Sequence, residues 1–173
     1  CSEILKKLTL NPTVEDEFID RDLTMIEYMN EIIKSFQEIS NKKFILNSNQ
    51  NSNSIKIMKS IEIVYGLRNF IGNANKFSKS KIYINIKSDS DFTEIIVEDD
   101  GEGFPKEVLS KIGEPYIKSF KLSTKSKSGL GLGIFIGKTL LEKNFATVLC
   151  RNSKTRSGAE VSIKWKNKDL LSL

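Results

Sequence analysis

The chain has 173 residues, of which 39% are hydrophobic and 28% are charged, and it carries a formal net charge of +5. This composition excludes an intrinsically disordered chain, and no apolar run approaches the roughly 20 residues that a membrane-spanning helix needs. The sequence contains no histidine and only two cysteines, which excludes Ser-His triads, histidine general bases, histidine metal sites and a disulfide framework.

The basic net charge suits a polyanionic small molecule such as a nucleotide, and it is equally compatible with nucleic acid. The lysines, however, are spread along the chain without the aromatic–basic stripe that nucleic-acid-binding surfaces carry. We therefore expect no nucleic-acid partner.

The first ten residues, Cys1–Leu10, place apolar side chains on one side and are typical of the end of a helix, which Asn11-Pro12 terminates. We expect residues 1–12 to be the stub of a preceding helical module and residues 13–173 to form one domain. Apolar residues at steps of three or four then predict a long amphipathic helix over Asp22–Ile39.

The middle of the chain combines helical and strand patterns. Alternating isoleucines predict a strand over Lys81–Lys87, and a run rich in Asn and Ser predicts a turn over Asn47–Asn53. The other elements expected here are strands over Lys43–Leu46 and Thr93–Glu98 and a second long helix over Ile61–Ser78.

The last part of the chain begins with a stretch rich in Ser, Lys and Gly, residues 119–133, which predicts a loop. A helix is then expected over Gly133–Lys143, followed by strands over Ala146–Arg151 and Ala159–Trp165 that pair through the turn RNSKTRSG. The order of elements predicts the α+β class, as a two-layer α/β sandwich with helices on one face of a mixed sheet.

A first candidate motif lies on the second long helix, in RNFIGNANKFS. Asn69, Asn73, Lys76 and Phe77 fall on one stripe of that helix. An amide oxygen is a suitable ligand for Mg²⁺, a lysine can reach a phosphate, and an aromatic ring can pack on a flat base. Taken alone, the pattern is also typical of a helix whose asparagines face solvent and whose Phe77 belongs to the core.

A second candidate motif, DDGEGFP, follows the strand that ends near Glu98. Asp99 can accept a hydrogen bond from an exocyclic amine such as that of adenine. Gly101 and Gly103 allow the backbone to turn sharply and to approach a ligand closely. Taken alone, this motif is also typical of an ordinary glycine-containing loop.

A third candidate motif is SGLGLGIF, with Gly129, Gly131 and Gly133 ahead of a predicted helix. Exposed backbone amides at a helix start suit a phosphate. The spacing matches neither the dinucleotide-binding fingerprint nor the Walker A loop, so the motif alone is a weak signal.

Together and in this order, the three motifs resemble the N, G1 and G2 boxes of the GHKL ATP-binding superfamily. This superfamily contains sensor histidine kinases, gyrase-type ATPases, heat-shock protein 90 and anti-sigma-factor kinases. The resemblance covers about Asp22–Trp165 and implies the Bergerat fold, an α/β sandwich, with ATP and Mg²⁺ as cofactors.

The resemblance also implies a role for each motif residue. Asn73 would coordinate the Mg²⁺ that bridges the phosphates, and Lys76 would lie near those phosphates. Phe77 would pack against the adenine, and Asp99 would accept a hydrogen bond from the adenine amine. Gly101 and Gly103 would shape the floor of the pocket.

The resemblance implies that the G2 box closes on the phosphates and that a flexible ATP lid spans about residues 114–130. Glu114-Pro115-Tyr116 resembles the aromatic box that precedes this lid in histidine kinases, so Tyr116 is a candidate binding residue. The G2 residues implied to bind the cofactor are Gly129, Leu130, Gly131, Leu132 and Gly133.

Asn69 distinguishes between the members of the superfamily. The hydrolases and the anti-sigma kinases typically have a glutamate general base at this position, and an amide cannot take the proton. Transfer to a strong nucleophile such as imidazole depends mainly on positioning and charge neutralisation. Asn69 therefore favours a histidine kinase over a hydrolase or a stand-alone anti-sigma-type serine kinase. A non-catalytic ATP-binding regulatory domain, which would use the same pocket, stays an alternative.

A histidine kinase implies partners outside this sequence. The phosphorylated histidine would lie on a dimerising two-helix module upstream of Cys1, and the phosphoryl group would pass on to a cognate response regulator. The full protein would be a membrane-anchored homodimer, with this domain on the cytoplasmic side of an inner membrane.

Within the kinases, the sequence resembles the RegB/PrrB group of redox-responding membrane kinases. Cys1-Ser2-Glu3-Ile4-Leu5 is similar to the run that holds the redox-sensitive cysteine of that group, and GLGIFIGKTLLEKNFA is similar to its G2-helix segment. Cys1 is thus either a redox-active cysteine or an incidental helix cysteine. Cys150, in a predicted strand, is expected to be a small buried hydrophobe.

Overall fold

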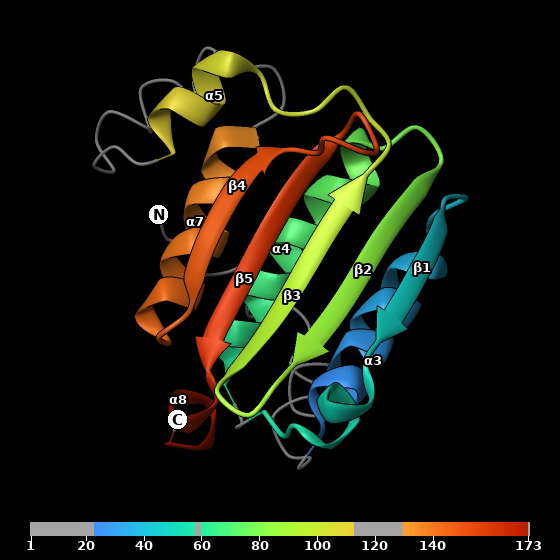
Figure 1. Cartoon of the computed structure of the whole chain (residues 1–173). Coiled ribbons are helices and arrows are strands. Elements are labelled where there is room, and N and C mark those ends of the chain that lie inside the picture. Colours follow the sequence, from blue (N-terminus) through green and yellow to red (C-terminus); the bar gives the residue numbers. More distant parts are fainter. Residues whose placement is uncertain (1–22, 58–59, 113–129, 173) are drawn as a thin grey trace.

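The computed structural model describes residues 23–57, 60–112 and 130–172, in which long helices cover one face of a five-stranded sheet (Figure 1). The helices on this face are α3 (Met25–Gln37), α4 (Ile61–Phe77) and α7 (Leu130–Lys143). The strands are β1 (Lys43–Ser48), β2 (Lys81–Ser88), β3 (Phe92–Asp99), β4 (Thr147–Asn152) and β5 (Ala159–Lys166). The shorter elements are the 3₁₀ helix η1 (Gln50–Ser54) and the helices α5 (Lys106–Lys111) and α8 (Asn167–Ser172).

The sheet has the strand order β1-β2-β3-β5-β4, with β1 parallel to β2 and the other neighbours antiparallel. This arrangement confirms the predicted mixed sheet and the predicted pairing of the last two strands. Strand β5 inserts between β3 and β4, so Val97 of β3 pairs with Val161 of β5. The insertion brings the end of β3 beside the start of β5.

Side chains along each strand point alternately to the two faces of the sheet, so one face is buried and the other is more exposed to solvent. On β2, Ile82, Ile84 and Ile86 are buried under the helices, whereas Tyr83 and Asn85 point to the opposite face and are half-buried. The hydrophobic core therefore lies between the sheet and the three long helices, which confirms the predicted two-layer sandwich. No helix in the described part of the chain is long and apolar enough to cross a membrane.

Capping residues determine where the long helices α3 and α4 begin. Thr24 accepts a hydrogen bond from the amide of Glu27, and the Glu27 carboxylate accepts one from the amide of Thr24, which forms a capping box. Helix α3 therefore begins at Met25 rather than at the predicted Asp22. The side chain of Ser60 caps α4 in the same way, by accepting from the amide of Ile63.

Two further predictions about local structure were wrong, and two short helices were missed. Helix α7 begins at Leu130 rather than at Gly133, so Gly131 and Gly133 lie inside its first turns and not ahead of the helix. The predicted turn over 47–53 is shared between the end of β1 and the helical turn η1. Helices α5 and α8 were not predicted, because each has only six residues and presents no periodic window.

Glycines allow α4 and α7 to lie close together. A Cβ atom on Gly66 of α4 would stand 2.6 Å from Cγ of Leu141, and one on Gly137 of α7 would stand 2.8 Å from Cε2 of Phe70. Phe70 is 1% exposed, so its ring cannot swing into solvent. In contrast, a Cβ atom on Gly72 would meet the ring of Phe36 at an ordinary 3.5 Å.

These distances predict opposite effects of two chemically identical substitutions. Gly72→Ala should stabilise the fold by about 0.5–1 kcal/mol, because alanine is the better helix former. Gly137→Ala should destabilise it by about 1–2 kcal/mol. The free-energy cost of overpacking against Phe70 is expected to exceed the gain in helix propensity that alanine brings. Urea unfolding of both variants measures the two changes, and stabilisation of both would contradict the close approach of α4 and α7.

Candidate functional site

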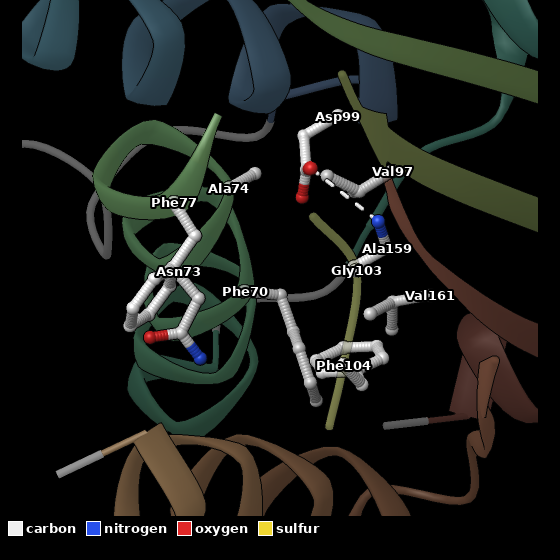
Figure 2. A pocket seen from close by; sticks show the side chains of 10 residues that line it. All are labelled: Phe70, Asn73, Ala74, Phe77, Val97, Asp99, Gly103, Phe104, Ala159 and Val161. Carbon is white, nitrogen blue, oxygen red and sulfur yellow. Dashed lines mark hydrogen bonds between the residues drawn. The ribbon is translucent and has the colours of Figure 1, made fainter. Parts of the chain in front are cut away.

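A pocket opens between α4 and the adjoining ends of β3 and β5 (Figure 2). Side chains from the last turns of α4 form one wall, and residues of β3, β5 and the segment after β3 form the other. The lining residues are Phe70, Asn73, Ala74, Phe77, Val97, Asp99, Gly103, Phe104, Ala159 and Val161. The pocket thus combines apolar walls with one carboxylate and one amide.

Asp99 is the last residue of β3 and is 3% exposed. Its Oδ1 accepts hydrogen bonds from the amide of Gly101 at 2.8 Å and from the amide of Ala159 at 3.3 Å. Both bonds from described residues end on the same oxygen, which leaves Oδ2 for a ligand. Figure 2 shows the carboxylate directed into the pocket beside Ala159.

Asp99 accepts hydrogen bonds from backbone amides and forms no salt bridge with a described residue. Burial raises the pKa of the Asp99 carboxyl group above its usual range, and the two amide hydrogen bonds oppose this rise. Asp100 raises the pKa further by repulsion, and the ammonium group of Lys42 lowers it. Such a carboxylate can accept a hydrogen bond from a neutral amine without competition from a bound cation.

Three glycines let the backbone pack around this carboxylate. A Cβ atom on Gly101 would stand 2.2 Å from the carbonyl oxygen of Phe77, and one on Gly158 would stand 2.1 Å from the carbonyl oxygen of Asp99. Gly103 has a φ of +83°, in the region that favours glycine. Gly101 and Gly103 were expected at the site, whereas Gly158 was missed because it looked like an ordinary turn residue.

The α4 wall brings together Asn73 and Phe77. The Nδ2 atom of Asn73 is buried and has no hydrogen-bond partner among the described residues, which is rare for a buried polar atom. A Cβ atom on Gly133 of α7 would stand 3.3 Å from the Oδ1 atom of Asn73, so this amide faces the start of α7. Phe77 is 36% exposed and lines the pocket rather than belonging to the core.

Two other predicted site residues on α4 lie outside the lining. Asn69 is one turn before Asn73, and its Nδ2 donates to the carbonyl of Tyr65 at 2.8 Å. Lys76 is exposed, with its ammonium 5.5 Å from the ring centroid of Phe77.

Several predicted residues lie wholly or partly outside the described part of the chain. Only backbone helix is described for Leu130, Gly131 and Leu132. The predicted stub (residues 1–12), most of the predicted lid and three individual candidates are not described, the three candidates being Cys1, Tyr116 and Gly129. Cys150 is a free, half-buried thiol, and burial raises its pKa to about 12.

The apolar lining was missed by the sequence analysis. A signal for part of it was present, because Val97 alternates with Asp99 on one strand and Phe104 follows the second glycine of DDGEGFP. The contributions of Ala159 and Val161 depend on the insertion of β5 beside β3, which local sequence patterns do not contain. The apolar lining residues missed were Phe70, Ala74, Val97, Phe104, Ala159 and Val161.

Asp100, next to Asp99, has a structural role. Its carboxylate accepts from the amides of Lys79 and Ser80 at 2.8 and 3.0 Å and from the Ser80 hydroxyl at 2.9 Å. Burial raises the pKa of Asp100, but these hydrogen bonds outweigh it and lower the pKa to about 2. The carboxylate thus fixes the connection between α4 and β2.

The lowered pKa predicts an acid-sensitive contribution to stability. Asp100 should stabilise the fold fully above the unfolded-state pKa of about 3.9, and this contribution should disappear as the pH falls toward 2. Asp100→Asn should therefore cost about 1 kcal/mol at neutral pH, and this cost should vanish as the pH falls through about 2. Urea unfolding across this range measures the change, with the exposed Asp91→Asn as control. A cost that does not depend on pH would contradict the prediction.

The donor set fits a magnesium ion held mainly by a ligand. No cluster of three or more Asp, Glu, His or Cys residues that could hold a metal occurs in the described chain. Asn73 offers one neutral amide oxygen. Mg²⁺ commonly keeps several waters and binds through few protein oxygens together with substrate phosphates, so one amide oxygen from the protein is sufficient.

A protein-family model described as "Histidine kinase-, DNA gyrase B-, and HSP90-like ATPase" matches residues 58–169, more than half of the chain. The chain belongs to this family. The matched region contains every described lining residue of the pocket, and the family resemblance expected from the three motifs is confirmed.

Curated relatives of this ATPase-family chain are sensor kinases. The sensor histidine kinase RegB of Cereibacter sphaeroides is 34% identical over 125 residues, which cover 63% of this chain and 27% of the relative. A putative NtrY-like sensor histidine kinase of Rickettsia conorii is 34% identical over 90 residues, which cover 52% of this chain and 14% of the relative. The chain thus spans only about a quarter of the length of the RegB relative.

Solved structures share the fold of this ATPase-family domain. The catalytic domain of histidine kinase ThkA superposes with a TM-score of 0.68 at 19% identity, covering 86% of this chain and 97% of that one. The blue-light-activated histidine kinase EL346 of Erythrobacter litoralis superposes with a TM-score of 0.67 at 15% identity, covering 96% of this chain and 55% of that one. The sandwich is therefore the fold of histidine kinase catalytic domains.

Proposed function

We propose that this chain is the ATP-binding catalytic domain of a two-component sensor histidine kinase. The observation that carries the proposal is the convergence of three features in one pocket: a buried carboxylate, apolar walls and a buried amide. Among the described residues, one oxygen of this carboxylate and the nitrogen of this amide have no hydrogen-bond partner. Family membership and the RegB and NtrY-like relatives support it.

In this proposal, the deep end of the pocket binds adenine. The Asp99 Oδ2 atom accepts a hydrogen bond from the exocyclic amine, while the amides of Gly101 and Ala159 keep the carboxylate in place. Phe104 and Val161 supply apolar surface for the flat base, and Phe77 covers it from α4. A guanine base presents a carbonyl oxygen where adenine has its amine. This oxygen is a second hydrogen-bond acceptor with partial negative charge, so the carboxylate would repel it.

The phosphates would lie toward α7. The first amides of a helix lack intrahelical partners and carry partial positive charge, so the first turn of α7, near Leu130–Leu132, can receive a phosphate. Asn73 would hold Mg²⁺, and exposed Lys76 would contribute positive charge. When bound, the ion neutralises charge that develops on the transferred phosphoryl group.

Asn69 would suit transfer rather than hydrolysis. Its amide donates to Tyr65 within its own helix and cannot act as a general base toward water. Positioning of the γ-phosphoryl group for an external imidazole is then the main task of the domain. The acceptor histidine would lie on an upstream dimerising module, and the phosphoryl group would pass to a response regulator aspartate.

The RegB likeness supports a finer proposal about the whole protein. We infer a membrane-anchored homodimer with this domain in the cytoplasm, in which oxidation of Cys1 modulates the kinase. Loss of redox response on Cys1→Ala substitution in the full-length protein, with basal kinase activity retained, is the expected result. An intact redox response would overturn only the proposed role of Cys1 and would leave the proposed kinase function untouched.

The test combines binding with transfer. Calorimetric titration with the ATP analogue AMP-PNP should show binding that strengthens with MgCl₂. Incubation with γ-labelled ATP and the upstream helical module should give an acid-labile, base-stable phosphohistidine on that module. Acid-stable phosphoserine on a partner would instead indicate an anti-sigma-type kinase. Tight binding without any transfer would indicate a non-catalytic regulatory domain.

A further inference from the structure

Lys42 lies between α3 and β1, and its ammonium group contacts the last turn of α4. Its Nζ atom donates to the carbonyl of Asn75 at 2.5 Å and to the carbonyl of Ser78 at 2.6 Å, and it is 3.5 Å from the carbonyl of Lys76. A second contact supports the same connection, because Ser40 donates to the side-chain oxygen of Asn75 at 2.6 Å.

The carbonyls of Asn75 and Lys76 belong to the last turn of α4, and that of Ser78, the C-cap residue, follows directly. The last four carbonyls of a helix accept no intrahelical bond, and together they form the negative end of the helix dipole. An ammonium has three donors and no acceptor, so it matches several carbonyls at once. Lys42 is half-buried, and its contacts are therefore less screened by water than those of a surface lysine.

The same turn of α4 is packed on its other side against the loop that carries Asp99. The Gly101 backbone lies so close to the Phe77 carbonyl that a Cβ atom would stand 2.2 Å away, and Asp100 binds the amides of Lys79 and Ser80. The end of α4 is thus held between Lys42 on one side and the loop after β3 on the other. Gly101 lies close to both walls of the pocket, because the same Cβ atom would stand 3.0 Å from the Oδ1 atom of Asp99.

We propose that Lys42 is a positioning residue for the adenine end of the pocket. By binding the last carbonyls of α4, Lys42 fixes Phe77 relative to the Asp99–Gly101 loop without touching the ligand. The inference rests on the proposed function, because it assigns a role toward the nucleotide that the pocket is proposed to bind.

Lys42 also influences Asp99 through its charge. The groups that bear on Asp99 are the amides of Gly101 and Ala159, the carboxylate of Asp100 and the ammonium of Lys42. Burial raises the pKa of Asp99 and Lys42 opposes this rise, so removal of the ammonium should raise the pKa further. A role limited to global stability would not move this titration.

The experiment compares Lys42→Gln with Lys43→Gln in the 173-residue chain. Lys43 is the exposed neighbour on β1, so its substitution removes the same charge without removing the contacts to α4. We expect Lys42→Gln to weaken AMP-PNP binding about tenfold, equivalent to about 1.4 kcal/mol, and Lys43→Gln to leave it within twofold. In the nucleotide-free chain, carbon-13 NMR should show Asp99 titrating at higher pH in Lys42→Gln only, and the amides of Phe77 and Ser78 should exchange faster.

The nucleotide-free measurements separate the two proposals. If the parent chain binds no AMP-PNP, the proposed function fails, whereas the Asp99 titration and amide exchange still decide the role of Lys42. Identical titration and exchange in Lys42→Gln and the parent would overturn that role. If Lys42→Gln does not fold, Lys42→Arg tests the positioning role, because arginine keeps the positive charge with a different shape. Asp99 should then titrate at the same pH as in the parent, while the amides of Phe77 and Ser78 exchange faster. Unchanged exchange in that variant would overturn the positioning role.

Discussion

Asp99→Asn is expected to weaken binding of AMP-PNP by about 10- to 100-fold. A hydrogen bond to a charged partner contributes about 1.5–3 kcal/mol, and the asparagine side chain would present an NH₂ donor to an adenine amine that also donates. Calorimetric titration at pH 7 measures this loss. Glu102→Gln, which removes one negative charge from the exposed part of the same loop, should bind like the parent.

The pH dependence distinguishes loss of an acceptor from loss of structure. The pKa of Asp99 is raised by burial, so the parent should lose affinity as the pH falls through that raised value, whereas Asp99→Asn should show no such transition. Because a raised carboxyl pKa means that the ionised form is disfavoured in the folded state, Asp99→Asn should not reduce stability at neutral pH. Unchanged affinity in a folded Asp99→Asn variant would overturn the adenine site.

Gly158→Ala should have the second large effect, on stability and binding together. The added methyl group would stand 2.1 Å from the carbonyl oxygen of Asp99 and 2.3 Å from its Oδ1 atom, and a backbone carbonyl cannot move aside as a flexible side chain can. We expect destabilisation of about 2–3 kcal/mol. Nucleotide affinity should also fall, because relief of the clash displaces the carboxylate.

Urea unfolding and AMP-PNP titration of the same Gly158→Ala sample test both effects. Gly72→Ala is the matched control, since it adds the same methyl group where ordinary contact distance is available. A lower midpoint with an unchanged slope would mean that the folded state was destabilised without a change in the surface exposed on unfolding. Parental stability and affinity in Gly158→Ala would contradict the packing of this turn against Asp99.

The elements with clear periodicity were predictable from the sequence. Helix α4 and strand β2 have long amphipathic or alternating patterns, and both lie within a residue of their predicted bounds. Helix α7 was placed too late, because its first residues alternate with glycine, which is a poor helix former, and tertiary packing against α4 overrides that preference. The fold class followed from the order of the predicted helices and strands, and the family followed from the order of the three motifs.

The site was predictable only where chemistry and local pattern coincide. Asp99 and Asn73 were identified from their motifs, and both lie in the pocket, although their roles stay predictions. Gly158 and Lys42 carry no local signal, because one contacts Asp99 across the sheet and the other contacts a helix end 33 residues away in sequence. Only the three-dimensional arrangement indicates that either residue bears on the pocket.

The insertion of β5 beside β3 has a consequence for how such domains diversify. The amide of Ala159 reaches Asp99 across 60 positions of sequence, so the carboxylate and its partner are joined by the sheet and not by the intervening chain. The entropic cost of closing a loop grows only with the logarithm of its length, about 0.6 kcal/mol for each doubling. The carboxylate, its amide partner and the apolar walls can therefore stay in register when the length of chain between β3 and β5 changes.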